Sequence, residues 1–99
     1  MADGVYPAPA EAPLTVETAR LFLVDTLDAP DALLKVLSVF AVQQVALATV
    51  DFAAAADGGQ VRIEARRLSA ERAQHLSERL RSVPVVRGVS VGWRMRTAS

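Results

Sequence analysis

The pattern of apolar and polar positions predicts that the folded part of the chain begins with a strand and continues into a helix. Residues 21–24 are apolar in succession within the segment 19–25, as expected for a central strand that is covered on both faces. From Pro30 to about Val42 the apolar residues recur at helical spacing instead. This face contains Leu33, Val36, Leu37, Phe40 and Ala41, whereas Val39 and Val42 lie off it and are predicted to make contacts outside the core of one chain.

The next two segments predict a β-hairpin. Residues 45–56 include β-favouring side chains such as Val50 and Phe52, and residues 61–66 alternate strictly between apolar and charged positions. The Asp57-Gly58-Gly59 sequence between them is a strong turn signal. Two neighbouring antiparallel strands are therefore expected here.

A second helix and a last strand complete the pattern. Ser69 is a favourable N-cap residue, and an apolar stripe follows it until Pro84 ends the helix. The stripe consists of Ala73, Leu76 and Leu80. Residues 85–95 then place apolar side chains on one face of a strand, namely Val89, Val91, Trp93 and Met95.

The order strand, helix, strand, strand, helix, strand predicts an α+β fold of the ferredoxin-like βαββαβ type. Right-handed crossovers would put both helices on one face of a four-stranded antiparallel sheet. The two-sided apolar strand predicts that a second subunit covers part of the remaining surface. We expect a homodimer that pairs edge strands into a longer sheet, packs sheet faces, or does both.

The 99 residues correspond to one compact domain. Residues 1–17 are rich in Ala, Pro and Glu without periodicity and are predicted to be a flexible arm, with the domain at 18–96 and a short tail at 97–99. A domain of this size buries only about two-thirds of its unfolded surface, so it gains stability from self-association.

Composition narrows the choice of chemistry and location. The chain has no cysteine, which excludes disulfides, thiolate metal sites and cysteine nucleophiles. The N-terminal residues lack the basic and apolar regions of a signal peptide, and no segment approaches the roughly 18 apolar residues that span a membrane. We expect a cytoplasmic protein with no membrane partner.

Charge is distributed unevenly although the net charge is zero. Residues 1–59 carry two basic and eight acidic side chains, and residues 60–99 carry nine basic and three acidic ones. Such asymmetry is compatible with a nucleic-acid surface, and also with two halves that interleave in space and neutralise each other. We favour the interleaved arrangement.

Two stretches of the chain resemble the ACT domain family. Between Val24 and Phe40 a strand ends in acidic residues, a proline-containing turn follows, and an apolar helix ends in Val39-Phe40-Ala41. The stretch Val50 to Glu64 is similar to the small regulatory subunit of acetolactate synthase in its short, single-domain form, and the similarity covers about residues 19–93. The motifs are apolar patterns and carry no chemical signature.

The resemblance implies a ligand site at the first turn and the start of the second strand. The corresponding residues are Asp28, Ala29, Pro30, Asp31, Gln44 and Ala46. The chain departs from the family here, because Asp31 stands where glycine is usual, and Gln44 and Ala46 stand where glycine and asparagine are common. A negative side chain and a missing amide both weaken capture of an amino-acid carboxylate.

By resemblance, the function is that of a non-catalytic regulatory or assembly module linked to amino-acid metabolism. Such a module would dimerise and act on a large catalytic subunit. The alternative is an amino-acid sensor that binds its effector at the dimer interface. No cofactor and no metal are expected.

Three motifs that can indicate catalysis or metal binding are better explained here by structural roles. Gly88-Val89-Ser90-Val91-Gly92 matches the G-x-S-x-G nucleophile elbow, but it lies within an alternating strand and no histidine follows it. His75, the only histidine, is predicted on the polar edge of the second helix. Asp25 and Asp28 are more typical of a helix start than of a metal site.

An RNA-binding module is the alternative from another class, because it shares the βαββαβ order. Such modules stack bases on aromatic residues of the third strand. Residues 60–67 contain no aromatic residue and Trp93 stands alone on the last strand, so we expect no nucleic-acid partner.

Overall fold

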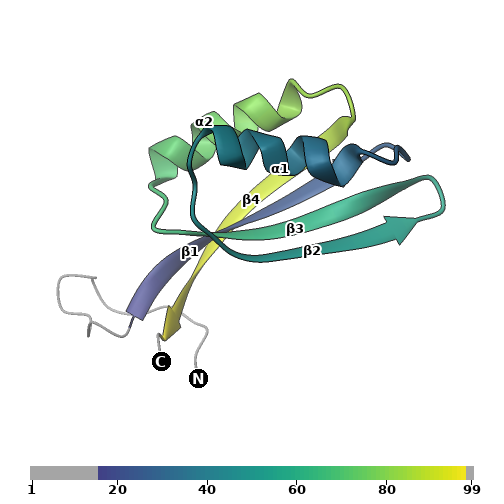
Figure 1. The fold of residues 1–99 in the computed structure, drawn as a ribbon. Helices are drawn as coiled ribbons and strands as arrows, with labels where there is room; N and C mark the ends of the chain where they lie inside the picture. The colour runs from purple at the N-terminus through teal and green to yellow at the C-terminus, as the bar shows by residue number, and fades with distance from the viewer. Residues whose placement is uncertain (1–15, 98–99) are drawn as a thin grey trace.

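The computed structural model describes residues 16–97 and contains six elements in the predicted order (Figure 1). They are β1 (Val16–Thr26), α1 (Ala32–Val42), β2 (Leu47–Ala55), β3 (Gly58–Arg66), α2 (Ala70–Arg81) and β4 (Val86–Thr97). β1 begins two residues before the predicted domain boundary and β4 ends one residue beyond it. Residues 1–15 of the predicted arm and 98–99 of the predicted tail lie outside the described residues.

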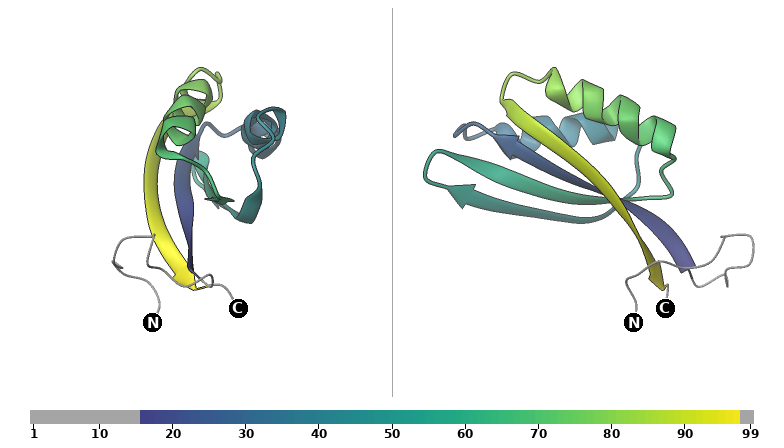
Figure 2. Two further views of the ribbon diagram at one scale, coloured as in Figure 1. Left: turned by 90° about the vertical axis from the view of Figure 1, so that its left-hand side faces the viewer. Right: turned by 180° about the vertical axis from the view of Figure 1, so that it is seen from behind.

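The strands form one antiparallel sheet in the order β2-β3-β1-β4, which leaves β2 and β4 at the edges. Both helices lie on the same face of this strongly twisted sheet (Figures 1 and 2). The ferredoxin-like fold predicted from the sequence is confirmed. The acidic and basic halves of the chain interleave in the sheet, where Asp51 of β2 lies opposite Arg62 of β3.

The hydrophobic core lies between the two helices and the central strands. Its fully or nearly fully buried members are Phe22 and Val24 of β1, Val36 and Phe40 of α1, Val61, Ile63 and Ala65 of β3, Leu68, and Ala73, Leu76 and Leu80 of α2. The rings of Phe22 and Phe40 meet edge to face with centroids 5.1 Å apart, a favourable aromatic geometry. β1 and β3 therefore supply the strand side of the core, and β2 and β4 add none of these residues.

The two helices begin in different ways. Ser69 caps α2 as predicted, since its Oγ accepts a hydrogen bond of 3.1 Å from the Arg72 amide. The prediction that α1 starts at Pro30 is wrong, because the helix begins at Ala32 with Asp31 as N-cap residue. Val42 is exposed as predicted, whereas Val39, which was expected outside the core, packs against it.

The hairpin turn is displaced from its predicted position. Ala55 pairs with Gly58, so the turn consists of Ala56 and Asp57, and both glycines belong to β3. Their small size serves close packing: a Cβ at position 58 would collide with the carbonyl oxygen of Thr26, and one at position 59 would lie 2.7 Å from the Phe52 ring. Glycine is favoured at both positions because neighbouring groups approach closely, and not because these two residues form the turn.

The last strand extends beyond the part of the sheet that the helices cover (Figure 2). Val91 lies opposite Phe22 in the register, so its side chain is on the helix side of the sheet. Even so, Val91 and Trp93 are exposed, at 42% and 55%. The motif Gly88–Gly92 lies inside β4, which gives Ser90 the ordinary strand setting that the sequence predicted.

Candidate functional site

The turn between β1 and α1 carries four of the predicted ligand residues. The Leu27 amide donates a hydrogen bond of 2.8 Å to the Val85 carbonyl, and the Ala32 amide donates one of 3.1 Å to the Ala29 carbonyl. These bonds fix the backbone on either side of the turn. Asp28, Pro30 and Asp31 remain exposed and Ala29 is half-buried, so the turn is open to solvent.

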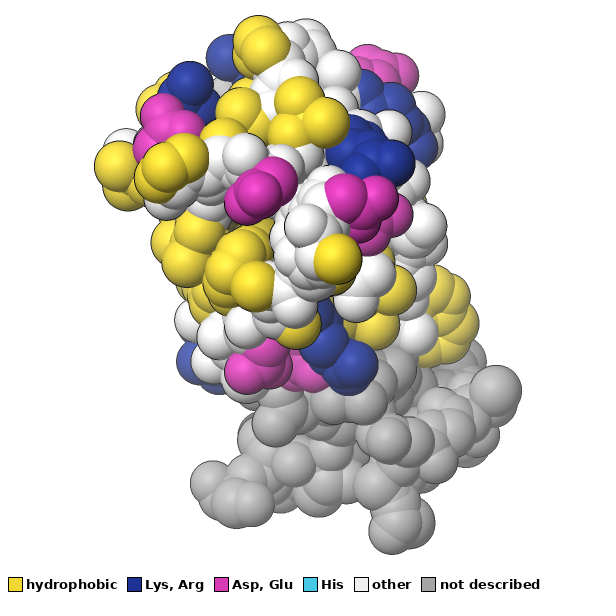
Figure 3. All heavy atoms as spheres, turned by 90° about the vertical axis from the view of Figure 1, so that its right-hand side faces the viewer, with side chains coloured by type: hydrophobic (Ala, Val, Ile, Leu, Met, Phe, Trp, Pro, Cys, Tyr) yellow, Lys and Arg dark blue, Asp and Glu magenta, His cyan; other side chains and the backbone are white. Residues whose placement is uncertain are grey.

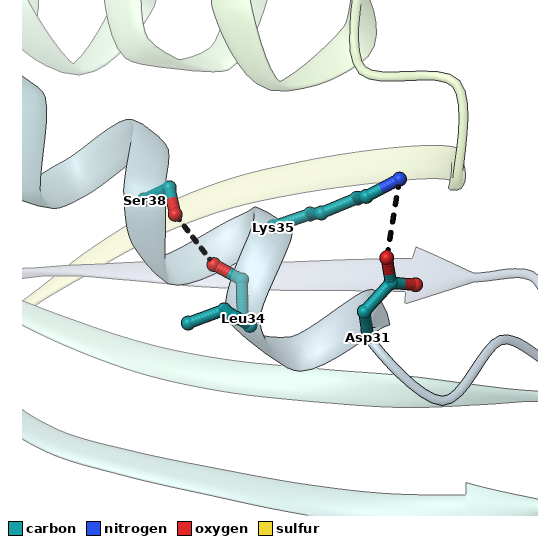
Figure 4. Close-up of polar contacts among 4 residues, drawn as sticks. All are labelled: Asp31, Leu34, Lys35 and Ser38. Atoms are coloured by element: carbon teal, nitrogen blue, oxygen red, sulfur yellow. Dashed lines mark hydrogen bonds and ion pairs between the residues drawn. The ribbon is translucent and has the colours of Figure 1, made fainter.

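Asp31 determines the charge at the start of α1. Its side chain makes no capping hydrogen bond, and its carboxylate lies 3.3 Å from the Lys35 ammonium one turn further along the helix (Figure 4). Both side chains are about half exposed, so the pair is worth only a few tenths of a kcal/mol. The φ angle of Asp31 is −101°, which does not require glycine. Lys35 is a residue of this site that sequence reasoning missed, although its four-residue spacing from Asp31 was a usable signal.

Gln44 and Ala46 lie at the opposite end of α1. The helix has 11 residues and is therefore about 16 Å long. Ala46 is held by its carbonyl, which accepts a hydrogen bond of 2.8 Å from the Arg66 amide of β3. A single chain does not bring this group next to Asp28–Asp31, so a site that uses both groups needs two chains.

Gln44 has the left-handed backbone conformation that glycine favours. Its φ angle is 57°, and it directly follows the C-cap residue Gln43. The Gln43 carbonyl accepts a hydrogen bond of 2.8 Å from the Arg72 guanidinium, which ties the end of α1 to α2. The left-handed conformation explains in physical terms why glycine suits this position.

The edge strand β2 forms an exposed apolar surface. All nine of its residues are exposed, including Leu47, Val50 and Phe52 at 36%, 38% and 46%. Register places Val50 opposite Ile63 and Phe52 opposite Val61, so both side chains are on the helix side of the sheet, beyond the reach of the helices. We call Leu47, Val50 and Phe52 the β2 surface. The sequence predicted the strand but could not show that its apolar side chains stay exposed among residues 16–97.

The groups considered for catalysis or metal binding are scattered. His75 is exposed on α2, and Asp25 accepts a hydrogen bond of 3.1 Å from the Gln60 side chain. Within residues 16–97, no three His, Cys, Asp or Glu side chains cluster closely enough to hold a metal ion. None of the helices described combines the length and apolar character needed to cross a bilayer.

The helix-free face differs from a base-stacking surface. On the two central strands this face carries Leu21, Leu23, Arg62 and Glu64, as their register positions opposite to the core residues require. The Arg62 guanidinium lies 3.8 Å from the nearly buried Glu64 carboxylate. Among these central positions there is no aromatic residue on which a base could stack.

Comparison with known families decides the classification. Residues 15–99 match the family described as ACT-like domain. The chain belongs to the ACT-like domain family. No curated protein matches it at a significant level. The resemblance to ACT domains seen in the sequence is thus confirmed, and the closer similarity to the acetolactate synthase small subunit stays a prediction.

Solved structures support the fold of this ACT-like domain. The ACT domain from GTP pyrophosphokinase of Chlorobium tepidum superimposes with a TM-score of 0.66 at 15% identity, over 79% of this chain and 100% of that one. The regulatory subunit of aspartate kinase from Thermus thermophilus, in its ligand-free form, gives a TM-score of 0.63 at 18% identity, over 81% of this chain and 53% of that one. At these identities the likeness concerns the fold alone.

Proposed function

We propose that this ACT-like chain is a non-catalytic regulatory or assembly module linked to amino-acid metabolism. It acts as a homodimer on a large catalytic subunit, in the manner of the small subunit of acetolactate synthase. The resemblance of residues 50–64 supports this proposal, and so do two structural neighbours whose names place such domains in a regulatory subunit of aspartate kinase and in a GTP pyrophosphokinase. A cytoplasmic location is part of the same proposal.

The exposed state of β2 is the observation that carries the proposal. An edge strand with free backbone groups and apolar side chains is a surface that proteins normally cover. Pairing of β2 with β2 of a second copy would satisfy the backbone groups and bury Val50 and Phe52. The other edge strand, β4, alternates Gly88, Ser90 and Gly92 with its apolar residues and also exposes Val91 and Trp93, so it serves as the comparison in the test.

Regulation would follow from coupling between this dimer and its catalytic partner. A module without chemistry of its own changes activity by binding one conformation of the partner better than another. In this ACT-like chain Ser90 is in the middle of a strand and His75 is on the surface of α2, so these two residues do not form a nucleophile and base pair. The role proposed for the chain is therefore binding.

The test is the oligomeric state of edge-strand variants. Val50→Lys combined with Phe52→Lys places two charges on the β2 surface, and Val91→Lys places one at a similarly exposed position, 42%, on the opposite edge. Sedimentation velocity should give a dimer for the wild type and for Val91→Lys, and a monomer for the double variant. A monomeric wild type, or a double variant that still dimerises, would refute β2 pairing.

An amino-acid sensor is the second candidate. It is favoured by the separation of Asp28–Asp31 from Gln44 and Ala46 along α1, since a two-fold axis beside β2 would bring the first group of one chain towards the second group of its partner. Ligand binding at ten times Kd stabilises a folded protein by about 1.4 kcal/mol.

Thermal unfolding with millimolar panels of the natural amino acids distinguishes the two candidates. We expect no shift for the wild type, because the Asp31 carboxylate repels the carboxylate of a ligand, and a shift for Asp31→Gly with at least one amino acid. A reproducible rise for the wild type with a single amino acid would establish the sensor instead.

A further inference from the structure

The edge strand β4 is open along the side that faces away from β1. Within residues 16–97 it pairs with β1 only. Its Val89 carbonyl accepts a hydrogen bond of 3.1 Å from the Arg81 guanidinium of α2, and the later part of the strand extends past the helices (Figure 2). Val91 and Trp93 are exposed on this strand. An open edge that carries apolar side chains is suited to pairing with a further strand.

The composition of this edge indicates what kind of segment it fits. The β4 sequence contains three arginines and no acidic residue. Every second residue from Gly88 to Gly92 is small, so another backbone can approach closely on one face. By contrast, the end of the molecule near the hairpin turn mixes hydrophobic, basic and acidic side chains (Figure 3). The β4 edge therefore fits an extended apolar segment that carries negative charge.

The chain itself contains such a segment directly before β1. From Val5 to Leu14 every residue except Glu11 is apolar. Residues 1–15 contain two acidic residues and neither lysine nor arginine, so their charge is complementary to that of β4. Without periodicity the segment is not expected to fold alone. A strand added to a sheet edge, however, is held mainly by main-chain hydrogen bonds.

The positions of the prolines leave one side of this segment free to pair. In an extended chain, the N–H and C=O groups of successive residues point to opposite sides. Pro7, Pro9 and Pro13 all have odd numbers, so their missing N–H groups fall on the same side. Donors are retained on the other side by the even-numbered residues Tyr6, Ala8, Ala10 and Ala12. Such a segment suits an edge position, where the proline side faces solvent.

The place where β1 begins allows the segment to reach β4 of its own chain. Val16 lies opposite Thr97, the last residue of β4. A strand outside β4 would lie two strand spacings from β1, which is about 10 Å. The four steps from Ala12 to Val16 span up to about 13 Å, so residues 13–15 can cross the end of β4. The segment would run antiparallel to β1 and therefore parallel to β4.

We propose that residues 6–12 add to the β4 edge of the same chain as a fifth strand of the sheet. Their even-numbered residues exchange main-chain hydrogen bonds with β4, and their apolar side chains shield Val91 and Trp93. Closing β4 in this way needs neither a second copy nor a catalytic partner. It leaves β2 as the open edge, which is the edge that the proposed function uses.

A shift of one proline by one residue tests this pairing in the full chain. The double variant Pro9→Ala with Ala10→Pro keeps length, charge and composition but puts a proline on the pairing side. Pro9→Ala alone is the matched control, because it leaves every pairing donor in place. By NMR, the outward amides of β4 should exchange about tenfold or more slowly in the wild type and the control than in the double variant, with the β1 and β3 amides unchanged.

Trp93 provides a second measurement, because it is the only tryptophan of the chain. Acrylamide should quench its fluorescence less in the wild type and in Pro9→Ala than in the double variant. Rapid exchange of the outward β4 amides in the wild type would overturn the pairing. Equal exchange and equal quenching in the wild type and the double variant would also overturn it.

A nitroxide label locates the segment, since a chain without cysteine accepts one at Gly4→Cys alone. In the labelled chain the β4 amides should broaden more than those of β2. A mixture of labelled chain with unlabelled ¹⁵N chain should show no such broadening, because the segment pairs within its own chain. Strongest broadening at β2, or broadening of β4 in the mixture, would overturn the proposal. Protection of β4 that does not depend on protein concentration would separate this pairing from dimerisation through β2.

Discussion

Gly58 lies directly against the backbone of Thr26, so that a Cβ at position 58 would collide with the Thr26 carbonyl oxygen. Thr26 is buried at the end of the central strand β1 and cannot move without disturbing the sheet. A Cβ at the neighbouring Gly59 would lie 2.7 Å from the ring of Phe52, which is about half exposed, and no closer than 3.4 Å to a backbone atom, the Ala53 carbonyl oxygen. The two adjacent glycines therefore differ in what surrounds them.

Gly58→Ala should destabilise the protein by about 1–3 kcal/mol, because the added methyl group forces the backbone apart. Gly59→Ala should change stability by less than about 1 kcal/mol, since displacement of the Phe52 ring is offset by the lower entropy of the unfolded chain. Urea unfolding of both variants gives the comparison. Equal losses at the two positions would contradict the contact with Thr26.

Gln44→Gly should stabilise the protein by about 1 kcal/mol. The φ angle of 57° strains any side chain with a Cβ, and glycine adopts this conformation without strain. Gln43→Gly is the control, because Gln43 has a φ angle of −84° and should lose stability. A decrease in the free energy of unfolding for Gln44→Gly would show that the side chain of Gln44 makes a contact worth more than the strain.

The two helix starts should respond differently to truncation. Ser69→Ala removes the acceptor for the Arg72 amide and should cost about 1 kcal/mol. Asp31→Ala removes an exposed ion pair with Lys35 and no capping bond, so it should cost about 0.5 kcal/mol or less. Thermal unfolding at low and high salt checks both values, and only the small Asp31 effect should fall with salt. A larger loss at Asp31 than at Ser69 would be inconsistent with these caps.

The core should be most sensitive at the aromatic pair. Phe40→Ala removes the ring that meets Phe22 edge to face and should cost about 3–5 kcal/mol, much of the stability of a domain this small. His75→Ala, at an exposed position of the other helix, should stay within about 0.5 kcal/mol. Chemical denaturation measures both. A small loss in the free energy of unfolding for Phe40→Ala would contradict the packing of α1 on the sheet through the Phe40 ring.

The sequence was sufficient for the fold because each element carries its own period and boundary signal. The consecutive apolar residues of β1, the stripe and Ser69 cap of α2, and the alternation in β3 each agree with the observed structure. The start of α1 was placed two residues early, since proline near a helix start does not say on which side of the N-cap it lies. Val39 lies off the predicted apolar face of α1 and still packs against the core, because the buried part of the helix surface is wider than one stripe.

The functional surfaces were harder to predict, because they depend on what the rest of the chain leaves uncovered. Val50 and Phe52 have the spacing of an ordinary half-buried strand, and only the sheet order shows that the helices do not reach them. No local sequence signal predicts the β-bulge between Val86 and Gly88, from which the Arg87 side chain donates a hydrogen bond to the Asp57 carbonyl. The sequence Asp57-Gly58-Gly59 predicts a turn although both glycines belong to β3, because a turn and the close approach of neighbouring groups both favour glycine.

The most direct measurement is hydrogen exchange at the outward-pointing amides of β2 as a function of protein concentration. On an unpaired edge strand, alternate amides face solvent and exchange rapidly, while the others bond to β3. We expect these β2 amides to become protected as the concentration rises through the dimer dissociation constant, with the β4 amides unchanged. Rapid exchange along β2 at every concentration, in a sample that sedimentation shows to be monomeric, would contradict an assembly role through this edge.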